Sequence, residues 1–129
     1  MTAVQQALLE KARRALAAAR AGVARDDAET AINRAYYATF YAAQAALDTF
    51  DEHPKTHTGV LRRFQHHFVQ PGRLPLATGG ILAHAFDLRQ RADYDAFATF
   101  ETRRASDLVD DAGQFVQAVE ALLHDPSRS

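Results

Sequence analysis

The chain has 129 residues, of which 47 % are hydrophobic and 24 % are charged, a composition typical of one folded globular domain. Its formal net charge of −1 excludes binding of nucleic acid or acidic membranes through the charge of the whole molecule, so any such contact requires a local patch. The absence of cysteine excludes disulfides, thiolate catalysis and zinc sites built from cysteine.

The first predicted helix carries apolar residues at steps of three and four, the spacing of an amphipathic helix. This stripe consists of Val4, Leu8, Ala12, Ala15, Leu16, Ala19 and Val23. Gly22 and the Arg25-Asp26-Asp27 sequence end the pattern. Asp26 is a candidate N-cap for the next helix, because Glu29 follows three residues later as in a capping box.

The second predicted helix, from about residue 28 to residue 50, has three distinct faces. Its apolar face consists of Ile32, Tyr36, Phe40, Ala43, Leu47 and Phe50. A stripe of small residues that permits close approach of another helix consists of Ala31, Ala35, Ala38, Ala42 and Ala45. The third face is polar with two aromatic rings, and consists of Asn33, Tyr37, Tyr41 and Gln44. The first two faces predict contacts with neighbouring helices.

A third helix is predicted from about residue 58 to residue 69. Its inward-facing residues are Val60, Leu61, Phe64 and Phe68. Pro71 and Gly72 end this helix, because proline cannot continue the hydrogen-bond ladder and glycine tolerates the turn.

Two further helices complete the prediction. The fourth runs from about residue 76 to residue 93, with the stripe Ile81, Ala85, Leu88 and Ala92. We expect its Gly79-Gly80 pair to permit tight packing against the alanine stripe. The fifth runs from about residue 97 to residue 124, through Phe100, Leu108, Ala112, Phe115, Val119 and Leu122. Residues 125–129 are expected to fray.

These elements predict a single domain over residues 1–129, an all-α, up-and-down bundle of four or five helices with its core between about residues 3 and 124. No segment alternates between apolar and polar residues as a half-buried strand does, so no sheet is expected. No apolar run is long enough to cross a bilayer, and the N-terminal segment lacks the apolar core of a signal peptide. We therefore expect a cytoplasmic protein.

Three stretches of the chain together resemble the HEPN superfamily (higher eukaryotes and prokaryotes nucleotide-binding) in its small prokaryotic form. They are AINRAYYATFYAA at residues 31–43, KTHTGV at residues 55–60 and LRQRADYD at residues 88–95. The resemblance covers about residues 28–123 and implies a helical bundle that forms homodimers. It also implies a minimal nucleotidyltransferase as partner. In several members it implies an RNA-cleaving toxin activity within toxin–antitoxin or defence modules.

The sequence departs from the motif of the ribonuclease members, in which four to six residues separate an arginine from a histidine. Arg89 matches the arginine, but Tyr94 stands where the shortest spacing would place histidine, and no histidine follows Arg91 as far as Thr99. Some relatives accept AMP on a tyrosine two residues after the histidine, and that place here is Ala96. The missing histidine therefore leaves ribonuclease activity open. If this chain accepts AMP on a tyrosine, Tyr94 is the candidate in place of Ala96.

The candidate site around Arg89 has two interpretations. Arg89 with Asp93, and Asp87 with Arg91, have the spacing of surface ion pairs that each contribute about 0.3–0.5 kcal/mol. Alternatively, Arg89 and Arg91 bind phosphate oxygens through their guanidinium groups. Tyr94 would then donate a hydrogen bond or stack on a base.

Tyr37 lies on the polar face of the second predicted helix, and Arg34 lies beside that face. Packing with satisfied hydroxyl groups explains this face without a ligand. The alternative places Arg34 and Tyr37 in one cleft with Arg89, where aromatic rings beside arginines suit stacking on an unpaired base.

Lys55 and His57 precede or begin the third predicted helix, where a helix N-terminus and nearby hydroxyl groups suit an anion. Helix capping by Thr56 or Thr58 explains the same residues. His57 is the candidate substitute for the missing motif histidine, because histidine transfers protons near neutral pH.

The remaining histidines predict no metal site and no cofactor. His66 and His67 are adjacent, and adjacent helical residues point to different sides and do not chelate as residues four apart do. Together with nearby arginines they form a basic patch consisting of Arg62, Arg63, His66, His67 and Arg73. The patch is either a solvated face or a contact surface for RNA or an acidic partner.

Three classes of function follow. The first is a homodimeric HEPN-type component of a toxin–antitoxin or defence-like module, which binds RNA or a nucleotide and a nucleotidyltransferase and is catalytically silent or altered. The second is a metal-independent endoribonuclease toxin, in which Arg89 stabilises the charged transition state and His57 or Tyr94 assists. The third is a purely structural interaction bundle.

Overall fold

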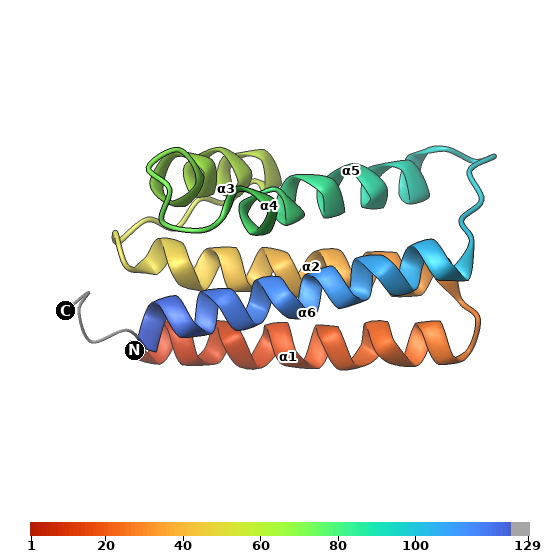
Figure 1. The fold of residues 1–129 in the computed structure, drawn as a ribbon, viewed down its shortest axis with the longest axis horizontal. Coiled ribbons are helices and arrows are strands. Elements are labelled where there is room, and N and C mark those ends of the chain that lie inside the picture. The colour runs from red at the N-terminus through yellow and green to blue at the C-terminus, as the bar shows by residue number, and fades with distance from the viewer. Residues whose placement is uncertain (125–129) are drawn as a thin grey trace.

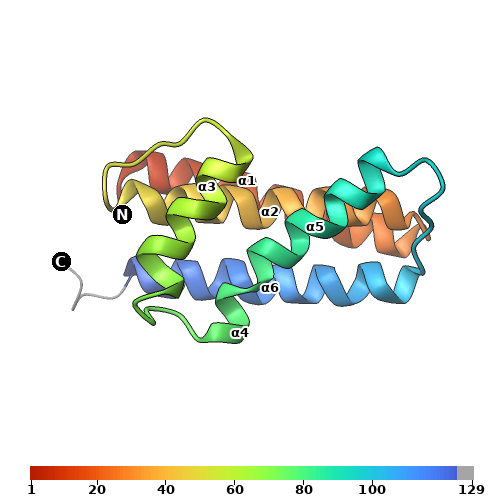
Figure 2. The same cartoon turned by 90° about the horizontal axis from the view of Figure 1, so that it is seen from above.

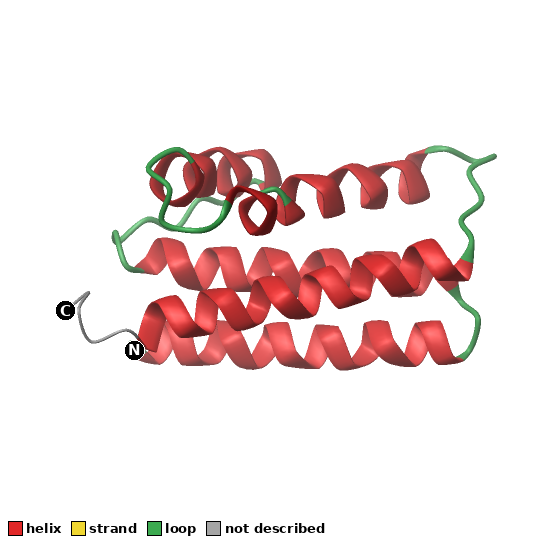
Figure 3. Ribbon diagram, in the orientation of Figure 1, coloured by secondary structure: helices red, strands yellow, loops and turns green. Residues whose placement is uncertain are grey.

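The computed structural model describes residues 1–124, so the expected fraying of residues 125–129 lies outside the described part of the chain. Within residues 1–124 all regular structure is helical, as Figure 3 shows. The elements in chain order are α1 (Ala3–Ala24), α2 (Ala28–Asp48), α3 (His57–Phe64), the π-helical η1 (Gln65–Val69), α4 (Leu76–Gly79), α5 (Ile81–Tyr94) and α6 (Thr102–His124). Because η1 continues α3 and α4 leads into α5, the predicted all-α bundle of five helices is confirmed.

The helices form two layers, one of α1, α2 and α6 and the other of α3, α4 and α5 (Figure 1). The long helices α1, α2 and α6 run side by side, and α2 contacts α1, α3, α5 and α6. Viewed from above, α3 and α5 cross this layer obliquely (Figure 2). No helix within residues 1–124 is long and apolar enough to span a membrane.

The alanine stripe of α2 is completely buried, as its small side chains predicted. Ala31, at its start, lies against α1 at Gly22, where a Cβ atom would be only 3.0 Å from the Ala31 backbone nitrogen. Helix α1 is therefore the element that approaches α2 closely.

The predicted apolar stripe of α1 is wrong at its first member. Val4 is 48 % exposed, whereas the neighbouring Gln5 and Leu9 are buried. Gln5 tolerates burial because its amide donates hydrogen bonds to the Ala45 carbonyl at 3.2 Å and to Thr49 Oγ1 at 3.1 Å. Its side-chain oxygen also accepts from the Thr2 backbone, which completes a capping box.

The predicted N-cap of α2 is also wrong by one residue. Asp27, not Asp26, caps the helix, because its carboxylate accepts a hydrogen bond from the Thr30 N–H at 3.2 Å. Asp26 has φ 59° and forms the turn after α1. Its carboxylate accepts a hydrogen bond from the Thr102 hydroxyl at the start of α6.

The second half of the chain differs from the prediction at two boundaries. The predicted helix over residues 76–93 is interrupted at Gly80, and a Cβ on Gly79 would lie 2.8 Å from Val69, so this glycine packs against η1 and not against the alanine stripe. The last helix begins at Thr102 instead of residue 97, because Asp95 ends α5 and accepts a hydrogen bond from the Phe97 N–H at 3.0 Å.

Candidate functional site

Tyr36 of α2 is the residue around which the other helices place the predicted site residues. Its side chain is only 1 % exposed. The Arg89 guanidinium of α5 lies 5.4 Å from the centre of its ring, and the His57 ring at the start of α3 lies 5.6 Å from it. Its hydroxyl is 2.5 Å from His57 Nδ1. The structure thus brings Arg89 and His57 together, although 31 residues separate them in sequence.

Arg89 is held by both charge and aromatic contacts. Its Nε lies 2.8 Å from Asp93 Oδ2, and only 16 % of the Arg89 side chain is exposed. The Nε atom is itself buried, so the Asp93 carboxylate is the charged group that it meets. The guanidinium also lies 5.6 Å from the Tyr37 ring, a distance typical of a cation–π contact. Arg89 is therefore a largely buried cation that packs on aromatic rings and has one carboxylate partner.

The protonation states of His57 and Tyr36 determine the direction of their hydrogen bond. Burial, and secondarily the Arg89 charge, lower the pKa of His57 below its usual 6.5. Burial raises the pKa of Tyr36 well above its usual range. At neutral pH the Tyr36 hydroxyl consequently donates to a neutral His57 at Nδ1, and the ring proton of His57 is on Nε2. The basic nitrogen of His57 is therefore already occupied by Tyr36.

Arg34 and Tyr37 lie beside the same cluster. The Arg34 guanidinium is 4.9 Å from the Tyr37 ring, which the Arg89 guanidinium also contacts. Arg34 donates hydrogen bonds to Asn33 Oδ1 at 2.8 and 3.0 Å, which orient its guanidinium. Tyr37 thus joins the two arginines within one cluster.

An open hollow of about 540 Å³ adjoins the cluster and brings in Lys55. We call it the aromatic hollow; its lining residues are Leu8, Tyr37, Phe40, Tyr41, Gln44, Glu52, His53, Pro54, Lys55 and His57. Phe40 stacks on His57 with ring centres 4.7 Å apart, and this contact holds the imidazole in the lining of the aromatic hollow. Arg89 contacts Tyr37 but does not line the hollow.

Two of the predicted residues lie away from this cluster. Tyr94, at the end of α5, is 77 % exposed. Arg91 pairs with Asp87 at 3.1 Å, and both side chains are more than half exposed, so this pair has the character of a weak surface ion pair. Asp93 is in the cluster through its contact with Arg89.

Part of the predicted basic patch has a structural role that the sequence did not reveal. Glu52 accepts hydrogen bonds from Arg63 at 2.6 and 2.9 Å and from His67 at 2.5 Å. The hydrogen bonds from Arg63 and then His67 lower the pKa of Glu52 to about 2. His67 also stacks on Phe50 with ring centres 3.9 Å apart. These contacts attach the segment after α2 to α3 and η1, and no sequence spacing links Glu52 to its partners.

Comparison with known proteins relates most of the chain to one family. The HEPN domain family model matches residues 5–122. A Methanocaldococcus jannaschii protein named "Putative toxin" is 35 % identical over 118 residues, which are 92 % of this chain and 87 % of the relative. A second protein of that name from the same organism is 31 % identical over 116 residues, covering 90 % and 79 % of the two chains. A UPF0332 protein of Gloeobacter violaceus is 34 % identical over 126 residues, covering 95 % and 98 %.

Proposed function

The chain belongs to the HEPN domain family, and we propose that it is a homodimeric component of a toxin–antitoxin or defence-like module. In this proposal it binds RNA or a nucleotide and a minimal nucleotidyltransferase, and does not itself cleave RNA. The toxin names of two relatives that match most of the chain support the type of module.

The arrangement around Arg89 carries the proposal. Arg89 provides a cation that can bind phosphate oxygens through its guanidinium group, which is held beside Tyr36 and Tyr37. Metal-independent cleavage of RNA also requires a group that accepts a proton from the attacking hydroxyl. Tyr94 is exposed at the far end of α5, and the Nδ1 of His57 is occupied by the Tyr36 hydroxyl. An anion-binding site without an available base supports binding over cleavage.

A ribonuclease with an altered motif is the second candidate, and the proximity of His57 to Arg89 favours it. Both residues pack on the Tyr36 ring, so one substrate could contact both of them. In this alternative, His57 must exchange its hydrogen bond from Tyr36 for one from the substrate. Arg89 would then stabilise the negative charge that develops on the phosphate.

The experiment that separates the two candidates is an RNA cleavage assay on the purified protein, with light scattering on the same samples. The variants are Arg89→Ala and, as a matched control, Arg91→Ala, which removes an exposed arginine from the same helix. We expect a dimeric wild-type protein without cleavage activity. Cleavage that is lost in an intact Arg89→Ala dimer and retained in Arg91→Ala would establish the ribonuclease instead.

The partner is tested by co-expression of this chain with the product of the neighbouring gene, which the proposal expects to be a minimal nucleotidyltransferase. We expect the two proteins to purify together and the complex to persist through size-exclusion chromatography. A monomeric protein that binds neither RNA, nucleotide nor such a partner would contradict the proposal.

A further inference from the structure

The helices α1 and α2 carry two hollows that share Tyr41 as a lining residue. One is the aromatic hollow described above. The other, which we call the cationic hollow, has a volume of about 230 Å³ and is lined by Lys11, Arg14, Ala15, Ala18, Arg34 and Tyr41. We propose that the two hollows together bind unpaired nucleotides of single-stranded RNA, with bases in the aromatic hollow and phosphates at the cationic hollow. This inference rests on the proposed RNA-binding function and locates it on the protein.

The geometry of the helix pair places the two hollows in line. Arg34 and Tyr41 are seven residues apart on α2, which is two helical turns or about 10 Å along one face. Helix α1 runs antiparallel to α2 (Figure 1) and places the Lys11 Nζ 5.2 Å from the centre of the Tyr41 ring. Cations from both helices thus flank the aromatic residues at the junction.

The charge of this surface suits a polyanion. The cationic hollow is lined by three cations and by no carboxylate, although the chain as a whole has a net charge of −1. Lys55 adds an exposed cation to the aromatic hollow. The carboxylate in that hollow belongs to Glu52, which is already paired with Arg63 and His67. Phosphates on this surface would therefore meet unopposed positive charge.

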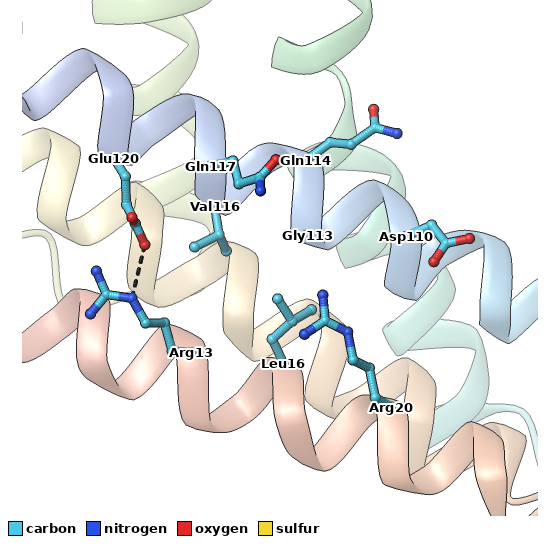
Figure 4. A pocket seen from close by; sticks show the side chains of 9 residues that line it. All are labelled: Arg13, Leu16, Arg20, Asp110, Gly113, Gln114, Val116, Gln117 and Glu120. Atoms are coloured by element: carbon cyan, nitrogen blue, oxygen red, sulfur yellow. Dashed lines mark hydrogen bonds and ion pairs between the residues drawn. The ribbon is translucent and has the colours of Figure 1, made fainter.

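A hollow on the other side of α1 provides a contrast. It lies between α1 and α6, has a volume of about 550 Å³, and is also lined by two arginines, Arg13 and Arg20 (Figure 4). Here Glu120 pairs with Arg13 at 3.0 Å, and Asp110 adds a second carboxylate to the lining. Its charges balance, so a phosphate there would not meet unopposed positive charge.

The aromatic side chains favour unpaired bases over duplex RNA. Tyr41 is partly buried, and its ring is supported by Tyr37 at 5.8 Å and Phe40 at 6.0 Å between ring centres. A ring held in this way loses little conformational freedom when a base stacks on it. Stacking requires a base that is not already stacked and paired in a helix, so the ligand is single-stranded.

The test measures binding of a short fluorescein-labelled single-stranded RNA by anisotropy at several salt concentrations. One variant combines Lys11→Glu with Arg14→Glu. The matched control combines Arg20→Glu with Arg103→Glu, which makes the same charge change at exposed positions outside both hollows. We expect the first variant to bind the RNA at least about tenfold more weakly than the wild type. The slope of log K against log[salt] should become about 1.4 less steep, because two contacts with phosphates of a single strand are lost. The control should bind nearly as well as the wild type.

The aromatic contribution is tested separately with Tyr41→Leu and Tyr41→Phe, after circular dichroism has verified folding. Tyr41→Leu should weaken RNA binding about tenfold. Tyr41→Phe should bind RNA nearly as tightly as the wild type, because the ring remains available for stacking. Equal weakening by the two double variants, or equally tight binding of duplex RNA, would overturn this site while leaving the proposed function intact. A wild-type protein that binds no RNA would overturn the RNA-binding function itself.

Discussion

Replacing Tyr36 by phenylalanine removes one hydroxyl group from the centre of the candidate site. The ring is 1 % exposed, and its contacts with Phe86 and Arg89, at 5.8 and 5.4 Å, do not depend on the hydroxyl. The lost group is the donor to His57 Nδ1 at 2.5 Å. His57 is partly buried, so leaving its Nδ1 without a donor costs at most the about 1–3 kcal/mol of a fully buried acceptor. This is less than the about 3–5 kcal/mol expected for truncation of an aromatic side chain to alanine.

Urea unfolding measures this difference directly. We expect Tyr36→Phe to lower the unfolding midpoint with an unchanged m value, since the surface exposed on unfolding is the same. Tyr37→Phe is the matched control, because the Tyr37 ring packs against Tyr36 but its hydroxyl takes no part in the Tyr36–His57 hydrogen bond. Its loss should change the free energy of unfolding by less than about 0.5 kcal/mol. Equal destabilisation by the two variants would refute the assigned role of the Tyr36–His57 hydrogen bond.

Two further predictions concern protonation and helix packing. Because the folded-state pKa of His57 is lowered, the unfolded chain binds a proton first, and the free energy of unfolding should fall as the pH decreases below 6.5. Urea titrations at several pH values should show a smaller fall for His57→Gln. Gly22→Ala should destabilise the fold by about 1–3 kcal/mol, because its Cβ would lie 3.0 Å from the Ala31 backbone. Gly113→Ala should instead be neutral or stabilise by up to about 1 kcal/mol in thermal unfolding, since its Cβ would meet Arg20 at 3.4 Å and Leu16 at 3.8 Å, both ordinary contact distances.

Specific outcomes would contradict these predictions. An unchanged pH dependence in His57→Gln would mean that the partly buried imidazole does not account for the acid sensitivity. A Gly22→Ala variant as stable as Gly113→Ala would show that α1 and α2 do not approach at that point as closely as described.

Helix boundaries mark where local sequence signals were insufficient. Asp26 and Asp27 are both good capping residues, and only the left-handed conformation of Asp26 decided which of them caps α2. The start of α6 at Thr102 was equally ambiguous, because the apolar pattern extends back to Phe97, which is 93 % exposed. An apolar side chain predicts burial only where a neighbouring element covers it.

In the candidate site too, the sequence identified some residues and missed others. Arg89 and His57 were identified from sequence, because a motif and a helix start pointed to them. Tyr36 was assigned only to the core, and Glu52 was missed, since each acts on residues of another helix. Lys11 and Tyr41 likewise meet across two helices, and neither helix alone indicates the contact.

The sequence by itself therefore determined the all-helical architecture and most of the buried positions, because periodicity and side-chain size act over a few neighbouring residues. Its motifs also indicated the family. The tertiary structure decided which side chains meet: His57 with Tyr36, Arg89 with Tyr37, and Lys11 with Tyr41. These meetings depend on how far each helix is rotated and shifted along its neighbour. That rotation and shift result from the packing of the whole core around α2, which no single segment encodes.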